Sequence, residues 1–392
     1  MIKLVNKKFD KKDLYLIKEE DAKLPGLSEG LSRASVATIR PILIKVARDR
    51  SAGKQPQEIL KEYESKNDFF GVSSINQRTI FEFGLLFYSI LPHTFDAVEL
   101  SPITPLGLNS VLTKISQDLS LSTMRLSEVV SDPTTPLILE CATRRRKLLR
   151  EETTKYTSVE LATMKRVLRL QPFDKDKGYM QHFNLLGLCS AGYDLGSAVS
   201  ITTEFVKNHI SIWLDFIEKL KSKGFVFNEV TVKLSDTAFL EHLIKNFSIP
   251  REIICKNAFN EKFDFLSEYK LPLPREVDSI SEIDHNPNKS RNIGQHYLLD
   301  LLAIEKNILN PLKIEYPQVH FRFDFARKAG LGYYDGVCFH IYGSTINGET
   351  IQIADGGSVD WLAKVMSNSK ERAVTSGFGA ELIQKRFNIE EE

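Results

Sequence analysis

The sequence predicts an α+β fold in which an antiparallel β-sheet is flanked by helices, with a helical accessory region at the N-terminus. Two pairs of strand-like runs predict the sheet. One pair flanks a polar turn over 173–179, and the other flanks Asn347-Gly348, a strong hairpin signal. Segments with helical spacing lie between the runs, and neither a GxGxxG fingerprint nor a phosphate-binding loop occurs. These observations argue against a dinucleotide-binding α/β fold.

The overall composition excludes some classes of function. The 392 residues carry 52 Lys and Arg against 51 Asp and Glu, a formal net charge of +1. Domains that bind nucleic acid mainly by charge are usually strongly basic, so only a local basic groove fits this balance. No apolar run reaches the ~18 residues of a membrane span, and the N-terminus lacks the apolar core of a signal peptide. The four cysteines form no CxxC pair, so we expect a cytoplasmic protein with reduced thiols and no metal site.

Residues 1–70 are polar, with helical spacing over 35–48 and again over 57–63. They carry no recognisable chemistry, so we expect a helical accessory region that packs on the core or binds a partner. The expected boundaries are 71–200 together with 318–392 for the core and 201–317 for an inserted α/β lobe.

A helix is predicted over 75–91, with Ser73 or Ser74 as its cap. Apolar residues cover most of its surface, which is typical of a helix buried in a core or between subunits. A strand is expected to begin at Phe95 and to stop at Pro102, because proline cannot donate to a central strand.

The remaining elements follow from the same spacing rules. Further helices are expected in part over 108–118 and 137–150, and over 197–222, 237–247, 296–308 and 377–386. Strands are expected over 166–171, 180–189, 230–234, 320–326, 333–342 and 350–354, with a short extended piece at Pro136–Leu139 and an irregular loop over 272–294.

In this order, the elements resemble the catalytic core of class II aminoacyl-tRNA synthetases. The resemblance is greatest to histidyl-tRNA synthetase and its paralogue, the regulatory subunit of ATP phosphoribosyltransferase. The helix over 75–91 and the strand after it resemble motif 1, which forms the dimer interface in that family. The resemblance therefore implies a homodimer through this helix.

The hairpin over 166–192 resembles motif 2 of the family. Arg169 falls where the family places the arginine that grips the ATP α-phosphate, and a fixed guanidinium there would stabilise the charge that builds up during adenylate formation. Gln171 replaces the usual glutamate, and Phe183 matches the aromatic residue that stacks on adenine. Glu140 resembles the glutamate of the Pro-Glu-Gly-Thr segment that lines the substrate pocket. The resemblance thus implies ATP with Mg²⁺ as a cofactor.

The segment over 330–339 resembles the Arg-Gly-Leu-Asp-Tyr-Tyr-Thr-Gly-x-x-Phe segment special to the histidyl branch. It implies that Tyr333 and Tyr334 line the substrate pocket. Gly356 and Gly357 resemble the Gly-Gly turn that follows, and the segment over 377–382 stands at the place of motif 3.

Four further positions depart from the family pattern. Ala329 and Leu382 stand where the family has its catalytic arginine and its motif 3 arginine, although Arg327 and Arg322 are close enough in sequence to substitute for one of them. Leu185 and Cys189 stand where the family has a glutamine and a glutamate that hold the α-amino group of histidine. A buried ammonium without partners is costly, so we do not expect this chain to charge tRNA with histidine.

These departures lead to one preferred hypothesis and two alternatives. We favour a paralogue without charging activity that binds a small ligand as a regulatory or assembly subunit of a protein partner, because each lost arginine weakens a phosphoryl-type transition state by several kcal/mol. The first alternative is a stand-alone ligase that adenylates another amino or carboxylic acid with ATP, using Arg169 and Arg327. The second is a tRNA-binding module that uses the basic run over 144–147, which otherwise is a solvated helix face.

Each residue also has a purely structural interpretation. Arg169 can pair with Glu152 or Asp174, and Glu140 can be a surface or capping carboxylate. Phe183 and the tyrosine pair can be ordinary packing residues.

Overall fold

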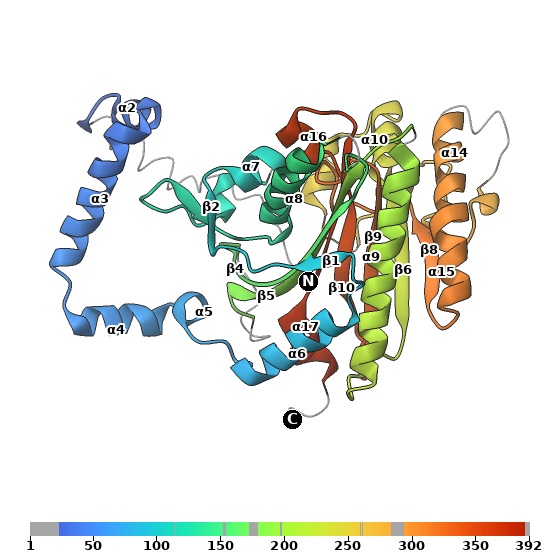
Figure 1. Cartoon of the computed structure of the whole chain (residues 1–392), viewed down its shortest axis with the longest axis horizontal. Helices are drawn as coiled ribbons and strands as arrows, with labels where there is room; N and C mark the ends of the chain where they lie inside the picture. Colours follow the sequence, from blue (N-terminus) through green and yellow to red (C-terminus); the bar gives the residue numbers. More distant parts are fainter. Residues whose placement is uncertain are drawn as a thin grey trace.

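The computed structural model describes residues 23–113, 115–151, 154–171, 179–196, 198–258, 260, 262–283 and 294–388. Nine strands form one sheet, in the spatial order β1 (Phe95–Ala97), β4 (Val159–Leu168), β5 (His182–Tyr193), β11 (Glu371–Phe378), β10 (Thr350–Val359), β9 (Val337–Ser344), β6 (Val230–Asp236), β8 (His320–Asp324) and β7 (Glu276–Val277) (Figure 1). Neighbours are antiparallel except for the parallel pairs β1–β4 and β6–β8. A separate two-stranded sheet joins β2 (Ile103–Pro105) to β3 (Ser127–Val129). The predicted α+β class is confirmed.

The α-helices longer than one turn are α2 (Leu27–Arg33), α3 (Val36–Ala52), α4 (Pro56–Ser65), α6 (Gln77–Ile90), α7 (Leu108–Thr113), α8 (Thr134–Leu148), α9 (Ala198–Lys221), α10 (Thr237–Asn246), α11 (Arg251–Lys256), α14 (Gln295–Ile304), α15 (Asn310–Glu315), α16 (Trp361–Met366) and α17 (Ala380–Phe387). Shorter helical pieces are α5 (Asn67–Phe70), α12 (Phe265–Glu268), the 3-10 turns η1 (Gln117–Leu119) and η3 (Ile280–Glu282), and the π-helical turn η4 (Glu305–Leu309).

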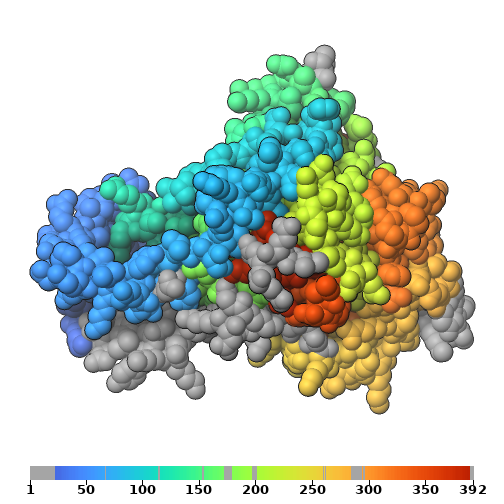
Figure 2. Space-filling model, turned by 90° about the horizontal axis from the view of Figure 1, so that it is seen from below, coloured from blue at the N-terminus to red at the C-terminus, as the bar shows by residue number. Residues whose placement is uncertain are grey.

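Helices cover both faces of the sheet. Helix α9 lies along one face with α6 beside it (Figures 1 and 2). Helices α8 and α16 cover the other face near β5 (Figure 1). Two apolar clusters follow this division, the larger one on the α9 side and the smaller one around α8. Because side chains alternate along a strand, each central strand contributes to both faces. The sequence from 201 to 317 supplies α9 and also β6, which pairs with β9, so the expected inserted lobe shares the sheet of the core.

The start of α6 differs from the sequence prediction. Asn76 is the capping residue, because its side chain accepts a hydrogen bond from the Arg78 amide. Neither Ser73 nor Ser74 caps the helix, and the Ser73 hydroxyl instead donates to Glu381 Oε2 at 3.1 Å. Ser73 therefore joins α17 to the start of α6.

Several strand and helix bounds also differ from the prediction. Strand β4 begins at Val159, well before the expected start, and Pro136–Leu139 is helical as part of α8. Tyr333 and Tyr334 lie in the turn before β9, whereas Gly356 and Gly357 lie within β10. Strand β11 and helix α16 have no counterpart in the prediction, because the small residues of β11 hide its alternation.

The N-terminal helices α2, α3 and α4 form an arm over residues 23–66 that extends from the sheet along the long axis of the molecule (Figure 1). None of the residues in these three helices is buried. The prediction of a helical N-terminal region is confirmed for this described part. Across the described chain, no helix is long and apolar enough to cross a membrane.

Candidate functional site

One face of the central strands carries polar side chains. The strand register places His340 beside Asp355 on the neighbouring strand and beside Lys233 on the other side. Their sequence neighbours Phe339 and Ile341 point into the apolar cluster on the α9 side. The alternation of polar and apolar residues in the sequence thus produces a polar surface, and the turn over 327–334 lies next to it.

Asp132, just before α8, connects two of the residues singled out by the sequence. Its Oδ2 accepts a hydrogen bond from the Tyr333 hydroxyl at 3.1 Å and lies 3.9 Å from Arg169 Nη2. Its Oδ1 accepts from the Thr134 hydroxyl at 2.7 Å, and that hydroxyl is 3.2 Å from the Tyr333 hydroxyl. The structure therefore brings Arg169 and Tyr333 together although they are far apart in sequence.

Arg169 is held by groups of the protein itself. Its Nε donates to the carbonyl of Ser131 at 2.8 Å, and its Cζ lies 5.4 Å from the centroid of the Phe183 ring. Such a position over an aromatic face is a cation–π contact. Of the alternative partners, Glu152 and Asp174 lie outside the described residues.

Arg327 differs from Arg169, because most of its hydrogen-bonding capacity is unused. Only 3% of its surface is exposed, and Nε donates to the carbonyl of Ala329 at 2.9 Å. Neither Nη1 nor Nη2 has a hydrogen-bond partner among the described residues. The guanidinium lies over Tyr334, with its Cζ 5.3 Å from the ring centroid. A buried guanidinium with two unsatisfied nitrogens is rare, because buried polar groups are nearly always bonded.

Glycine is required at position 330 in the turn beside this guanidinium. Gly330 has φ +87°, and a Cβ there would lie 2.8 Å from the Tyr334 ring and 3.2 Å from Arg327 Nη2. Any side chain at this position would be strained and would press on both groups. At position 330 the turn therefore places no side chain against the Arg327 guanidinium.

Asp355 supplies a partly buried carboxyl group near this guanidinium. Burial raises the pKa of its carboxyl, whereas the charges of Arg327 and Arg169 and a hydrogen bond from Tyr334 oppose that rise. Burial lowers the pKa of His340 well below its usual range, so the imidazole is neutral near pH 7. The site thus combines two guanidiniums with two carboxylates, and Arg327 and Asp355 form no ion pair with each other among the described contacts.

Three of the other singled-out residues lie away from this cluster or serve packing. Glu140 pairs with Arg144 on the partly exposed side of α8, with Oε1 2.8 Å from Nε. Gly356 faces the opposite side of the sheet, where a Cβ would lie 2.6 Å from the Phe339 ring. At Gly357 a Cβ would lie 2.5 Å from Cys338 Cβ, so this glycine permits close strand packing.

The remaining singled-out residues lie on β5 or just after β4. Leu185 shares the face of Phe183 and Cys189 on β5, since alternate residues face the same way. Cys189 is buried with its Sγ 3.4 Å from Cys141 Sγ, and Gln171 is buried just after β4. This face of β5 is therefore apolar where it meets α8.

The sequence prediction missed Asp132 and Thr134. The run Ser131-Asp132-Pro133 directly before a helix is a signal that places a carboxylate at a helix start, and it could have identified this position. Glu140 was singled out instead, because it resembles the glutamate of the Pro-Glu-Gly-Thr segment of the family. Once Pro136–Leu139 is helical, Glu140 lies more than one turn from the start of α8.

Arg145, within the basic run over 144–147, has neither of the two roles expected for that run, which were RNA contact and a solvated helix face. The side chain of Arg145 is fully buried, with Nε and Nη2 each 2.9 Å from the Glu371 carboxylate oxygens. Its other hydrogen bonds go to the carbonyls of Lys155 and Thr157. Arg145 is therefore neither solvated nor available to RNA, and Arg144 is paired with Asp96 and Glu140.

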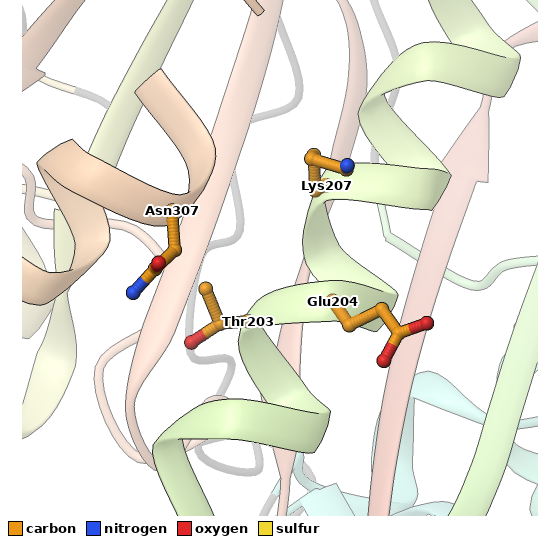
Figure 3. A pocket seen from close by; sticks show the side chains of 4 residues that line it. All are labelled: Thr203, Glu204, Lys207 and Asn307. Carbon is orange, nitrogen blue, oxygen red and sulfur yellow. The ribbon is translucent and has the colours of Figure 1, made fainter. Parts of the chain in front are cut away.

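A cavity of about 240 Å³ lies elsewhere, between α9 and η4. Thr203, Glu204, Lys207 and Asn307 line it (Figure 3). None of these residues belongs to the Arg169–Arg327 cluster. Among the described residues, no group of three or more His, Cys, Asp or Glu side chains is arranged to hold a metal ion.

Comparisons with known proteins identify the fold. Residues 276–384, which include the turn with Arg327 and strands β8 to β11, match the family model described as histidyl-tRNA synthetase. An ATP phosphoribosyltransferase regulatory subunit/histidyl-tRNA synthetase from Bacillus halodurans aligns with 82% of each chain at 17% identity and a TM-score of 0.56. The chain has a histidyl-tRNA synthetase fold.

Two further solved structures support the histidyl-tRNA synthetase fold. A histidine–tRNA ligase subunit from Alicyclobacillus acidocaldarius covers 80% of this chain and 95% of its own, at 12% identity and a TM-score of 0.57. Histidyl-tRNA synthetase from Nostoc sp. covers 80% and 73%, at 15% identity and a TM-score of 0.55. A search of curated proteins found no match. The resemblance stated from the sequence is confirmed at the level of the fold.

Proposed function

We propose that this chain is a histidyl-tRNA synthetase-like paralogue that does not charge tRNA and binds a small anionic ligand as a regulatory or assembly subunit. The observation that carries the proposal is the buried guanidinium of Arg327, whose Nη1 and Nη2 have no partner among the described residues. A carboxylate can accept both of these N–H groups in a bidentate arrangement, which is the geometry that a guanidinium favours.

The surroundings of Arg327 support a binding role for this guanidinium. Leaving a charged donor buried and unsatisfied costs free energy, and a ligand oxygen would remove that cost. Tyr333 and Thr134 offer hydroxyl groups nearby, and Asp132 and Asp355 offer carboxylates. A ligand with one anionic group and one hydrogen-bond donor would fit these charges.

The surroundings of Arg169 weigh against adenylate formation. Arg169 already bonds Ser131 and lies over Phe183, on the ring that adenine would use for stacking. Leu382, at the place of the motif 3 arginine, packs against the apolar cluster. Each missing charged donor costs a transition state roughly 3 kcal/mol, by analogy with an oxyanion donor, so ATP activation would be slow.

A protein partner is the natural target of such a subunit. The Bacillus halodurans neighbour is described as an ATP phosphoribosyltransferase regulatory subunit/histidyl-tRNA synthetase, and we extend the regulatory role to this chain as part of the proposal. Helix α6 also leaves Phe81 63% and Leu85 70% exposed, which supports the proposed homodimer through this helix. We place this assembly in the cytoplasm.

The proposal is tested by two assays on the purified chain. In ATP–pyrophosphate exchange with each proteinogenic amino acid, we expect no signal above background. In thermal denaturation with the same amino acids and a panel of small carboxylic acids, we expect at least one compound to raise Tm, and Arg327→Gln to abolish the rise. Arg322→Gln is the matched control, because Arg322 is already paired with Glu276 and Asp278.

The partner is tested by adding the chain to the catalytic subunit of ATP phosphoribosyltransferase from the same organism. We expect the two proteins to sediment as a complex. We also expect the reaction rate of the catalytic subunit to change on complex formation, by an amount that depends on the ligand. If the two proteins sediment separately and the reaction rate of the catalytic subunit stays constant, the regulatory role is wrong.

The ligase alternative remains a second candidate because Arg169 and Phe183 lie side by side at the end of the hairpin. It requires ATP-dependent pyrophosphate release that disappears in Arg169→Ala. That result would contradict the preferred proposal. The tRNA alternative has lost its main support, since Arg145 is buried in an ion pair.

A further inference from the structure

The polar face beside Arg327 holds a second side chain with an unused hydrogen-bonding group. His340 on β9 is only 5% exposed, and the strand register places it between Asp355 of β10 and Lys233 of β6. Its Nδ1 lies 3.2 Å from the Tyr342 hydroxyl, whereas its Nε2 has no hydrogen-bond partner among the described residues. The imidazole therefore leaves one ring nitrogen for a partner from outside the chain.

The contact with Tyr342 determines which nitrogen of His340 carries the proton. Burial lowers the pKa of His340 well below its usual range, so the ring is neutral near pH 7 and has a single N–H. Burial raises the pKa of Tyr342 to about 12, so its hydroxyl keeps its proton. Among the described residues that hydroxyl has no acceptor other than Nδ1, and an unpaired donor in a partly buried position is costly. Tyr342 therefore donates to Nδ1, which leaves the imidazole proton on Nε2.

Arg327 lies over the same part of the sheet as His340. Its guanidinium lies over the Tyr334 ring, and the Tyr334 hydroxyl donates to Asp355, the register partner of His340. After burial, the charge of Arg327 is the next cause that lowers the pKa of His340. Two nitrogens of Arg327 and one of His340 are thus donors that have no acceptor among the described residues, and the Asp355 carboxyl group lies beside them.

Resting on the proposed function, we propose that the ligand of Arg327 is a hydroxy carboxylic acid. Its carboxylate accepts from both Nη atoms of Arg327, and its hydroxyl accepts from His340 Nε2 and donates to Asp355. A hydroxyl is both a donor and an acceptor, so one group of the ligand satisfies both side chains. His340 then determines which class of acid the site binds.

The N–H of His340 discriminates against other acids through their hydrogen-bonding chemistry. An ammonium group has three donors and no acceptor, so an amino acid would place a donor against Nε2–H. A 2-oxo acid accepts from Nε2 but offers no donor to Asp355, and an unsubstituted acid serves neither group. A site built to bind a hydroxyl rejects analogues that lack it, because its own polar groups then stay unpaired.

The test compares acids that share a carbon skeleton. The first set is propanoate, lactate and alanine, the second is butanoate, 3-hydroxybutanoate and 3-aminobutanoate, and the third is 3-phenylpropanoate, 3-phenyllactate and phenylalanine. Affinity for the full-length chain is measured by isothermal titration calorimetry. In at least one set, we expect the hydroxy acid to bind about tenfold more tightly than either other member, because only the hydroxyl pairs with both His340 and Asp355.

Three variants separate the donor of His340 from its packing. His340→Leu removes the donor, so we expect the preference for the hydroxy acid to disappear while carboxylates still bind at Arg327. His340→Gln keeps an amide N–H in place of Nε2–H, so we expect it to retain part of the preference. Tyr342→Phe no longer fixes the proton on Nε2, so we expect the amino acid to gain on the hydroxy acid. His320→Leu is the matched control, because His320 is exposed on β8, and all affinity ratios should stay as in wild type.

A second measurement depends on no variant. Nitrogen NMR of the wild-type chain should show His340 with a protonated Nε2 and an unprotonated Nδ1, and a protonated Nδ1 would overturn the proposal. Equal affinities within every set, with binding still lost in Arg327→Gln, would also overturn it and would leave the proposed function intact. If none of these acids binds, the hydroxy acid assignment is wrong. If no acid of the wider panel raises Tm either, the ligand site itself is wrong.

Discussion

Two buried arginines in this molecule, Arg145 and Arg327, differ in whether their guanidinium nitrogens have hydrogen-bond acceptors. Arg145 is fully buried on α8 and bonds the Glu371 carboxylate and two backbone carbonyls, so each of its three nitrogens has an acceptor. Arg327 is 3% exposed in the turn before β9, and its two Nη atoms have no acceptor among the described residues. Both guanidiniums are shielded from water, but only that of Arg145 has all of its nitrogens bonded to acceptors of the protein in place of water.

The difference separates a structural charge from a binding charge. Arg145 fastens α8 to the sheet, because Glu371 starts β11. Arg327 fastens nothing beyond its own turn, since its single hydrogen bond goes to Ala329. An anion bound from outside would supply the hydrogen-bond acceptors that the buried Arg327 guanidinium lacks among the described residues. This is the basis of the proposed ligand site.

The largest expected effect is on folding, and it distinguishes the two arginines. Arg145→Met leaves Glu371 buried without a partner, and we expect the free energy of unfolding to fall by about 3–5 kcal/mol. Arg327→Met removes a charge that has no full set of partners, and we expect a change within about 1 kcal/mol. Urea denaturation of the two variants measures both values. Equal losses would mean that Arg327 is as structural as Arg145.

The next effect is on ligand affinity. For the acid that raises Tm, we expect Arg327→Gln to weaken binding by about 2–3 kcal/mol, because two charge-assisted hydrogen bonds are lost. Arg327→Lys keeps the charge but offers no planar pair of donors, so we expect an intermediate loss. We expect isothermal titration calorimetry to show ligand affinity decreasing from wild type to Arg327→Lys to Arg327→Gln. Equal affinity of all three proteins would exclude Arg327 from the site.

The partly buried carboxyl group of Asp236 gives a third prediction. Burial raises the pKa of Asp236, the cap of α10, to about 6. Since its unfolded value is near 3.8, the folded state binds more protons between these values, and this group makes the protein less stable as pH rises through about 6. Asn caps helices as well as Asp, so we expect Asp236→Asn to gain about 2 kcal/mol at pH 7. The gain should shrink toward pH 4.

The outcome is measured as the difference in unfolding free energy between Asp236→Asn and wild type across this pH range. A gain that is independent of pH would show that the carboxyl has an ordinary pKa in the folded protein.

The smallest expected effect is a proton taken up on binding. Burial already raises the pKa of Asp355 near Arg327, and a bound anion beside it would raise that pKa further. Affinity should therefore fall as pH rises, with a fraction of a proton taken up per ligand. Titrations in buffers of different ionisation enthalpy measure this uptake. Asp355→Asn should abolish it, and persistence in that variant would assign the proton to another group.

The sequence was sufficient for most of the fold. The hairpin around 175 and the hairpin at Asn347-Gly348 both occur in the main sheet, as β4–β5 and β9–β10. Strand β11 escaped prediction because Ala373, Ser376 and Gly377 replace the large apolar residues that mark a strand. Its burial is decided by neighbours on both sides, which no local pattern records.

The site was predictable in part. The sequence pointed to Arg169, Arg327 and the tyrosine pair, and the structure brings these residues into one region. It did not point to Asp132, because a carboxylate before a helix is usually a cap, and only the fold shows that Tyr333 and Arg169 meet there. Within the basic run over 144–147, the burial of Arg145 could not be predicted either, since its partner is 226 residues away in the chain.

The most direct test is a crystal structure of the wild-type chain with the small acid that most raises its Tm. The account expects one anionic group of that acid within hydrogen-bond distance of both Nη1 and Nη2 of Arg327, with Tyr333 and Asp355 beside it. A bound acid that leaves both Nη atoms without its oxygens would contradict the account.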